Sequence, residues 1–131
     1  MIVVDASVIA LALLNEERPG DRARDALTED NRWAMPEHWT VEVMSVIRGQ
    51  LLGGRIGAAQ AGDALDAVAE IQPEVPLTRL LVPRIWSLRG SLTTYDAAYV
   101  AAAEKYDCVL VTADAKLTRA GGIRCEVNLI S

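Results

Sequence analysis

Four acidic residues occupy positions from which a carboxylate could take part in catalysis or bind a metal ion. Asp5 ends the apolar run that opens the chain, and Asp114 stands just past a second apolar run, CVLVT. Glu42 interrupts an otherwise apolar helical stretch, and Asp96 opens an alanine-rich one. Crowded carboxylates repel one another, and hard cations such as Mg²⁺ or Mn²⁺ relieve that repulsion through oxygen ligands. The pattern predicts metal-assisted phosphodiester hydrolysis, in which a metal lowers the pKa of a bound water.

The two strand-end acids meet only if their strands are neighbours. Residues 1–5 and 108–112 are apolar throughout, as in parallel strands covered on both faces. Such strands alternate with helical patterns, which indicates an α/β fold with one domain over residues 1–131. The functional crevice of such a sheet lies beyond the carboxyl ends of its strands, where Asp5 and Asp114 would converge.

The remaining elements follow from periodicity and from Pro and Gly positions. Ser7 is the expected N-cap of the first helix. The motif at 78–90 reads as a helix with Pro83 early in it, where proline is tolerated. We expect helices over 8–14, 21–30, 37–52, 57–71, 78–90, 95–106 and 114–120, and further short strands over 32–35, 73–77 and 125–130.

Composition narrows the class of protein. With 51% hydrophobic and 24% charged residues, the chain has the balance of a soluble globular domain. No stretch approaches the roughly 20 apolar residues of a membrane span. The apolar first segment carries Asp5 and lacks a basic leader, so we do not expect it to be a signal peptide. Cys108 and Cys125 form no CxxC pair, which favours a reducing cytoplasm over a disulfide or zinc framework. The net charge of −5 argues against a protein that coats nucleic acid through bulk charge, but it does not exclude an enzyme that acts on nucleic acid.

Each candidate also has a purely structural interpretation. Asp5 has the type and position to cap the next helix, and Asp96 suits the positive end of a helix dipole. Glu42 would then lie on a solvated helix face, although its apolar surroundings weaken that interpretation. We favour a functional role for all four acids. We interpret His38 as a surface or capping residue, and Trp33, Trp39 and Trp86 as core residues and not base-stacking platforms.

The motifs VVDAS, PEHWTVEVMSVIR, LTTYDAAYVAAAE and VLVTAD, in this order, resemble those of PIN-domain ribonucleases. The likeness is greatest to the VapC-type toxins of bacterial and archaeal toxin–antitoxin pairs, and it covers essentially the whole chain. It implies a PIN-like three-layer α/β/α sandwich around a mostly parallel sheet. It also implies Mg²⁺- or Mn²⁺-dependent endonucleolytic cleavage of RNA, with Asp5, Glu42, Asp96 and Asp114 as the catalytic, metal-binding cluster.

The resemblance further implies supporting residues and partners. Ser7 and Thr112 match polar positions that support the acids, although a hydroxyl there is equally a local cap. A cognate antitoxin and a toxin homodimer are implied. Lys116 stands where some relatives carry a further acid, which places a second metal in doubt and leaves Lys116 free to meet a phosphate. Arg48 and Arg89 are further candidates for phosphate contacts.

Two other functions remain open. A phosphohydrolase that forms an aspartyl phosphate also starts from an apolar strand ending in Asp, but it usually needs a second acid two residues on, where this chain has Ser7. A catalytically degenerate binding module is the other. The intact set of four acids argues against it, because without catalysis nothing keeps repelling charges together.

Overall fold

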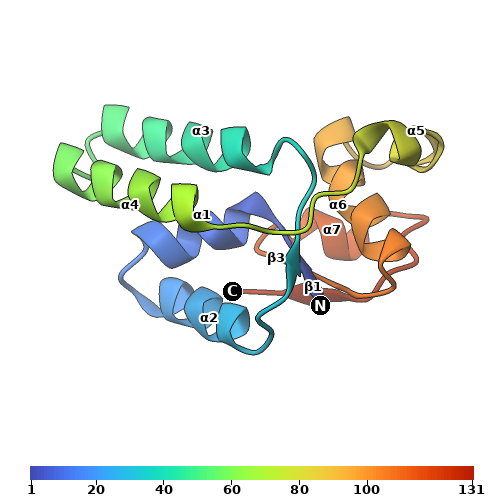
Figure 1. The fold of residues 1–131 in the computed structure, drawn as a ribbon, viewed down its shortest axis with the longest axis horizontal. Coiled ribbons are helices and arrows are strands. Elements are labelled where there is room, and N and C mark those ends of the chain that lie inside the picture. The colour runs from blue at the N-terminus through green and yellow to red at the C-terminus, as the bar shows by residue number, and fades with distance from the viewer.

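A four-stranded parallel sheet forms the centre of the computed structural model, which describes residues 1–131 (Figure 1). The strands β1, β2, β3 and β4 span Ile2–Val4, Trp33–Ala34, Val109–Thr112 and Val127–Leu129. Their order is β2-β1-β3-β4, and Val4 of β1 pairs with Val111 of β3. The neighbouring strands expected from the sequence are therefore confirmed, and the carboxyl ends of β1 and β3 lie side by side.

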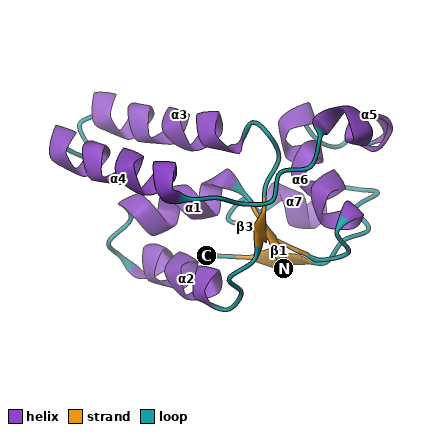
Figure 2. Cartoon of the chain, viewed as in Figure 1, coloured by secondary structure: helices purple, strands orange, loops and turns teal.

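Helices cover the sheet on both sides, which confirms the α/β/α sandwich (Figure 2). Helices α1 and α2 lie on one side, and α5, α6 and α7 lie on the other (Figure 1). Helices α3 and α4 pair with each other and pack over α1. The helices span Ala6–Leu14 (α1), Arg18–Thr28 (α2), Trp39–Leu52 (α3), Ala58–Glu70 (α4), Thr78–Ser87 (α5), Thr94–Lys105 (α6) and Lys116–Arg119 (α7). No helix combines the length and apolar character that a membrane crossing requires.

The alanines of α6 allow this helix to pack closely on the sheet. Ala97, Ala98, Ala101 and Ala102 are buried, and α6 contacts both β1 and β3. Small side chains let a helix axis approach its neighbour closely. One continuous hydrophobic core results, and it holds the first turn of α6 next to the carboxyl ends of β1 and β3.

Two proline-containing segments differ from expectation. The segment 73–77 forms no strand: Glu74 makes a single parallel bridge to Ala34. Pro73 and Pro76 lack the N–H groups that a longer ladder would need. Pro83 lies at the sixth of ten positions in α5, so the expectation of an early proline was wrong.

The outer face of α3 remains exposed. Val41, Met44, Ile47 and Leu51 recur at the spacing that predicted this helix, but only Ile47 among these four side chains is buried. The buried residues of α3 are Trp39, Val43 and Ile47. Because apolar residues occur on both faces, spacing alone did not identify the inner one.

Candidate active site

Asp5 is buried at the end of β1 and is held on both carboxylate oxygens. Thr112, the last residue of β3, donates its hydroxyl proton to Asp5 Oδ2 over 2.6 Å. The backbone N–H of Ser7 donates to Asp5 Oδ1 over 3.4 Å, so Asp5 is the N-cap of α1. The expectation that Ser7 caps this helix was wrong, because the helix begins at Ala6 and its cap is therefore Asp5. The capping interpretation of Asp5 and a functional one are compatible.

Thr112 and Ser7 both stabilise the turn that carries Asp114. The Thr112 hydroxyl accepts from the backbone N–H of Asp114 over 3.0 Å. Ser7 Oγ accepts from the backbone N–H of Ala113 over 3.1 Å. Asp114 Oδ1 in turn accepts from the backbone N–H of Lys116 over 2.9 Å, and Lys116 Nζ lies 3.6 Å from Asp114 Oδ2. These contacts join the ends of β1 and β3 into one rim.

Asp96 lies in the first turn of α6. Thr93 is the N-cap of this helix, and its hydroxyl accepts from the backbone N–H of Asp96 over 3.2 Å. A negative charge in the first turn is favourable beside the helix dipole. The sequence predicted this placement, and the structure places Asp96 close enough to Asp5 and Asp114 for their charges to affect one another.

Glu42 is held by two side chains that sequence reasoning did not assign to the site. Tyr99 donates its hydroxyl proton to Glu42 Oε1 over 2.8 Å. His38 Nε2 lies 3.1 Å from the same oxygen, and the two side chains form an ion pair when His38 is protonated. The geometry does not make this contact a hydrogen bond. The His38 ring packs edge to face on Tyr95 and Tyr99. The spacing of His38 and Glu42, one helical turn apart, was the available signal.

Burial and neighbouring charges raise the pKa values of Asp5 and Asp96. Burial is the largest cause that raises the pKa of Asp5, against the hydrogen bonds from Thr112 and Ser7, and the charge of Asp96 raises it further. Burial and then the charge of Asp114 raise the pKa of Asp96. Without a counter-charge, ionising Asp5 and Asp96 therefore costs free energy.

The pKa of Glu42 is shifted in the opposite direction to those of Asp5 and Asp96. Burial alone would raise the pKa of Glu42, but the contacts from His38 and Tyr99 outweigh it and hold this pKa below its ordinary value. The same ion pair raises the pKa of His38. Glu42, like Asp114 beside Lys116, thus has a basic side chain next to it, and the charge of Glu42 also raises the pKa of Asp96.

The site offers oxygen ligands but no preformed cage. No group of three or more His, Cys, Asp or Glu side chains is arranged to hold a metal ion. Mg²⁺ does not require such a cage, because it keeps several waters and binds through one or two carboxylates together with substrate phosphates. Two partly desolvated carboxylates with raised pKa values, Asp5 and Asp96, are the donors that such a cation suits.

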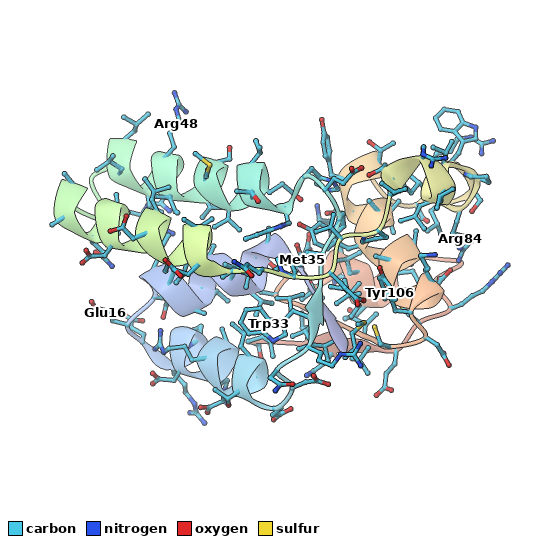
Figure 3. All side chains as sticks on the ribbon, in the orientation of Figure 1. Glu16, Trp33, Met35, Arg48, Arg84 and Tyr106 are labelled. Carbon is cyan, nitrogen blue, oxygen red and sulfur yellow. The ribbon has the colours of Figure 1, made fainter.

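The two arginine candidates do not reach the acids in this structure. Arg48 points outward from α3, away from the sheet (Figure 3). It lies six residues after Glu42, which places it about 9 Å further along the helix on a different face. The Arg89 guanidinium lies over the indole ring of Trp86, 5.0 Å from its centre.

The tryptophans divide between core and surface. Trp39 is buried, as expected, and Trp33 is partly buried with its indole N–H donating to the carbonyl of Asp30. Trp86 is 60% exposed, so the expectation that it belongs to the core was wrong. It lies on α5, where Leu81 and Ile85 supply the buried face.

The α/β/α fold agrees with the comparison to known proteins. The PIN domain matches residues 2–123, and the chain belongs to the PIN-domain family. Its relatives include VapC ribonucleases. Ribonuclease VapC9 of Mycobacterium tuberculosis is 37% identical over 131 residues, which cover 99% of this chain and 98% of that protein. Ribonuclease VapC1 of the same organism is 36% identical over 129 residues, covering 98% and 96%.

A solved structure supports the fold independently. The crystal structure of VapBC2 from Rickettsia felis, bound to a DNA fragment from their promoter, matches with a TM-score of 0.66. The match covers 100% of both chains at 15% sequence identity. At that identity the likeness concerns the α/β/α architecture alone.

Proposed function

We propose that this protein is a divalent-metal-dependent endoribonuclease and the toxin of a toxin–antitoxin pair. One arrangement carries the proposal. Asp5 is buried at the end of β1, and the Thr112 hydroxyl that binds it also positions Asp114. Asp96 lies close enough to raise the pKa of Asp5. The similarity to VapC ribonucleases over nearly the whole chain supports RNA as the substrate.

Each residue has a distinct task in this proposal. Asp5 and Asp96 would hold Mg²⁺ or Mn²⁺, with Asp114 and Glu42 completing the catalytic set. When bound, the cation would supply Lewis acidity toward a phosphate oxygen and would lower the pKa of a bound water. Thr112 and Ser7 orient the strand-end acids. Lys116, which is exposed beside Asp114, has the charge and position to meet a substrate phosphate.

Hydrogen bonds from neighbouring side chains orient two of the four carboxylates. The hydrogen bonds to Asp5 fix its rotamer before substrate arrives, and Tyr99 does the same for Glu42. Such preorganisation lowers the cost of reaching the transition state, because the charges need not reorient during the reaction. The residues outside the set of four therefore contribute to rate by positioning.

Replacement of single acids by their amides tests the function. The purified chain should cleave single-stranded RNA in Mn²⁺ and lose this activity in EDTA. Asp5→Asn and Asp96→Asn should abolish cleavage while circular dichroism shows an intact fold. Asp66→Asn, on the exposed surface of α4, is the matched control and should cleave as the wild type does. Isothermal titration with Mn²⁺ should detect binding to the wild type and the control only.

The alternatives give different results in the same experiment. Full cleavage by Asp5→Asn or Asp96→Asn would contradict the proposed site. A trapped aspartyl phosphate on Asp5 would favour the phosphohydrolase. Failure of the wild type to bind Mn²⁺ or cut RNA, with antitoxin binding retained, would favour the degenerate binding module.

We also propose a cognate antitoxin, a homodimer and a cytoplasmic location. The exposed apolar side chains of α3, such as Val41 and Met44, support a protein partner, since such patches commonly mark interfaces. The unpaired Cys108 and Cys125 suit a reducing compartment. Light scattering of the purified chain tests the dimer. Induction of this chain should arrest growth, and co-expression of a neighbouring small DNA-binding protein should relieve the arrest.

A further inference from the structure

An apolar pocket of about 360 Å³ opens beside the acidic rim. It lies between the N-terminal ends of α3 and α6 and one face of α5. His38 and Tyr95 line it on one side, and Val82, Ile85 and Trp86 line it on the other. Its volume falls in the range of small-ligand sites, which combine apolar and aromatic walls with a few polar groups.

The pocket and the acids share a wall. His38 lines the pocket and also lies 3.1 Å from Glu42 Oε1. Tyr95 contacts the His38 ring edge to face and directly precedes Asp96 in the chain. A molecule in this pocket is therefore separated from the Glu42 carboxylate by one side chain, His38.

Two exposed walls of the pocket are aromatic. Trp86 is 60% exposed and Tyr95 is 61% exposed, although large aromatic side chains are normally well buried. The guanidinium of Arg89 lies over the Trp86 ring, 5.0 Å from its centre, which places a positive charge next to the aromatic surface. Aromatic surface with a nearby arginine is the combination that binds unpaired bases and the phosphates between them.

We propose that this pocket binds one unpaired nucleobase of the RNA strand whose scissile phosphate lies at Asp5 and Asp96. The proposal rests on the proposed endoribonuclease function and adds a substrate subsite to it. With a net charge of −5, the chain gains little affinity for RNA from bulk charge, so stacking must supply a larger share of the binding free energy. Single-stranded segments are the form of RNA that exposes bases for stacking.

Thr94 also lines the pocket and carries a hydroxyl group. Thr94 lies in the first turn of α6 and lines the pocket beside Tyr95. A hydroxyl both donates and accepts hydrogen bonds, so it can pair with the edge of a stacked base.

Tryptophan fluorescence and RNA binding test the subsite directly. The probe is a short single-stranded oligoribonucleotide of mixed sequence, and its control is an abasic ribose-phosphate chain of the same length and charge. In EDTA, which prevents metal-dependent cleavage, the oligoribonucleotide should quench the fluorescence of the wild type and the abasic chain should not. Trp86→Ala should remove the quenching and weaken binding at least about fivefold, whereas Trp86→Phe should retain most of the affinity.

Cleavage in Mn²⁺ separates binding from chemistry. Trp86→Ala should raise KM for RNA by at least about fivefold and leave kcat nearly unchanged, because stacking is made in both ground and transition states. Leu52→Ala, which truncates an exposed apolar side chain at the far end of α3, is the matched control and should change neither constant.

The remaining outcomes assign each failure to its cause. If the wild type cleaves RNA and Trp86→Ala binds and cleaves it equally well, the subsite is wrong and the nuclease stands. If Trp86→Ala turns a dimer into monomers with RNA affinity unchanged, the pocket is an interface between copies, which also overturns the proposal. If the wild type never cleaves RNA, the nuclease is wrong, and base-dependent quenching in EDTA then decides the subsite alone.

Discussion

Thr112 Oγ1 donates a hydrogen bond of 2.6 Å to Asp5 Oδ2 and joins two residues 107 positions apart in the sequence. The same oxygen accepts from the backbone N–H of Asp114 over 3.0 Å. One hydroxyl therefore orients two of the four acids. This dual role is possible because β1 and β3 are parallel neighbours whose carboxyl ends coincide.

Removal of this hydroxyl should reduce cleavage without removing any acid. Thr112→Val keeps the branched shape but leaves Asp5 Oδ2 without its donor and the Asp114 N–H without its acceptor. We expect RNA cleavage and Mn²⁺ affinity to fall by about 10–100-fold, as is typical when a residue that orients a ligand is lost. Thr112→Ser keeps the hydroxyl and should retain most activity. Equal activity of the Val and Ser variants would contradict the orienting role.

Tyr99→Phe should have a similar but separate effect at Glu42. Tyr99 is fully buried, and phenylalanine fills the same space without the hydroxyl that donates to Glu42 Oε1. Loss of this donor should raise the pKa of Glu42 and lower kcat about tenfold. Tyr106→Phe, outside the site, is the control. Initial cleavage rates in Mn²⁺ at saturating RNA measure both variants, and an unchanged kcat in Tyr99→Phe would argue against a positioned Glu42.

The sequence predicts the strand-end acids because their placement follows from one rule of parallel sheets. Apolar strands that run in the same direction bring their following residues to one edge. Asp5 and Asp114 obey this rule, and the alanine face of α6 adds Asp96. The pattern of apolar residues in the sequence was therefore sufficient to predict these positions. The roles of the acids remain predictions, which the proposed substitutions test.

The contacts of Glu42 were not predictable in the same way. Tyr99 is 57 residues away from Glu42 in sequence, and their contact depends on where the first turn of α3 lies relative to α6. No local sequence pattern encodes the relative position of two helices. His38 was assigned to the surface or to a cap. It is the N-cap residue of α3, but its side chain makes no capping hydrogen bond and lies between Glu42 and the pocket.

Exposure of Trp86 and of the α3 outer face was missed for a related reason. Hydrophobic type and helical spacing predict that a face is buried, but they do not reveal apolar residues left uncovered for another molecule. Trp86 was therefore assigned to the core, and the spacing of the apolar residues in α3 predicted a helix without showing which of them stay exposed. Their exposure became visible only when the packing of α3 and α5 was known.

Glu104→Gln should destabilise the fold at neutral pH and much less in acid. Arg84 donates to Glu104 through Nε at 2.7 Å and Nη2 at 3.0 Å, and the backbone N–H of Arg124 donates over 3.0 Å. Burial alone would raise the pKa of Glu104, but these hydrogen bonds and the charge of Arg84 outweigh it and hold the pKa below its ordinary value. We expect Glu104→Gln to lose about 1–3 kcal/mol of unfolding free energy at pH 7.

The sign of this pH dependence follows from proton linkage. Because the pKa of Glu104 is lower in the folded chain, the unfolded chain binds more protons near this pKa. The stabilisation is complete above the ordinary value of 4.5 and is lost as pH falls through the folded-state pKa. Urea denaturation across this range should show the difference between wild type and Glu104→Gln shrinking toward acid. Asp21→Asn, which breaks an exposed pair with Arg24, should show little difference at any pH.

Gly20→Ala should destabilise the packing of α1 against α2. A Cβ at Gly20 would lie 1.9 Å from the carbonyl oxygen of Asn15 and 2.7 Å from its carbonyl carbon. Backbone atoms cannot move aside as a side chain can, and the N–H of Gly20 already donates to Asn15 Oδ1. We expect a loss of about 1–3 kcal/mol in the free energy of unfolding, as for other overpacked sites.

Gly62→Ala provides the matched comparison, because a Cβ there meets nothing within 4 Å in the middle of α4. Alanine favours the helix over glycine, so this variant should gain about 0.5–1 kcal/mol. Urea denaturation at pH 7 measures both variants. Opposite signs for the same chemical change would establish that the close approach at Asn15, and not helix propensity, requires glycine at position 20. A Gly20→Ala protein as stable as the wild type would show instead that the turn between α1 and α2 relaxes at no cost.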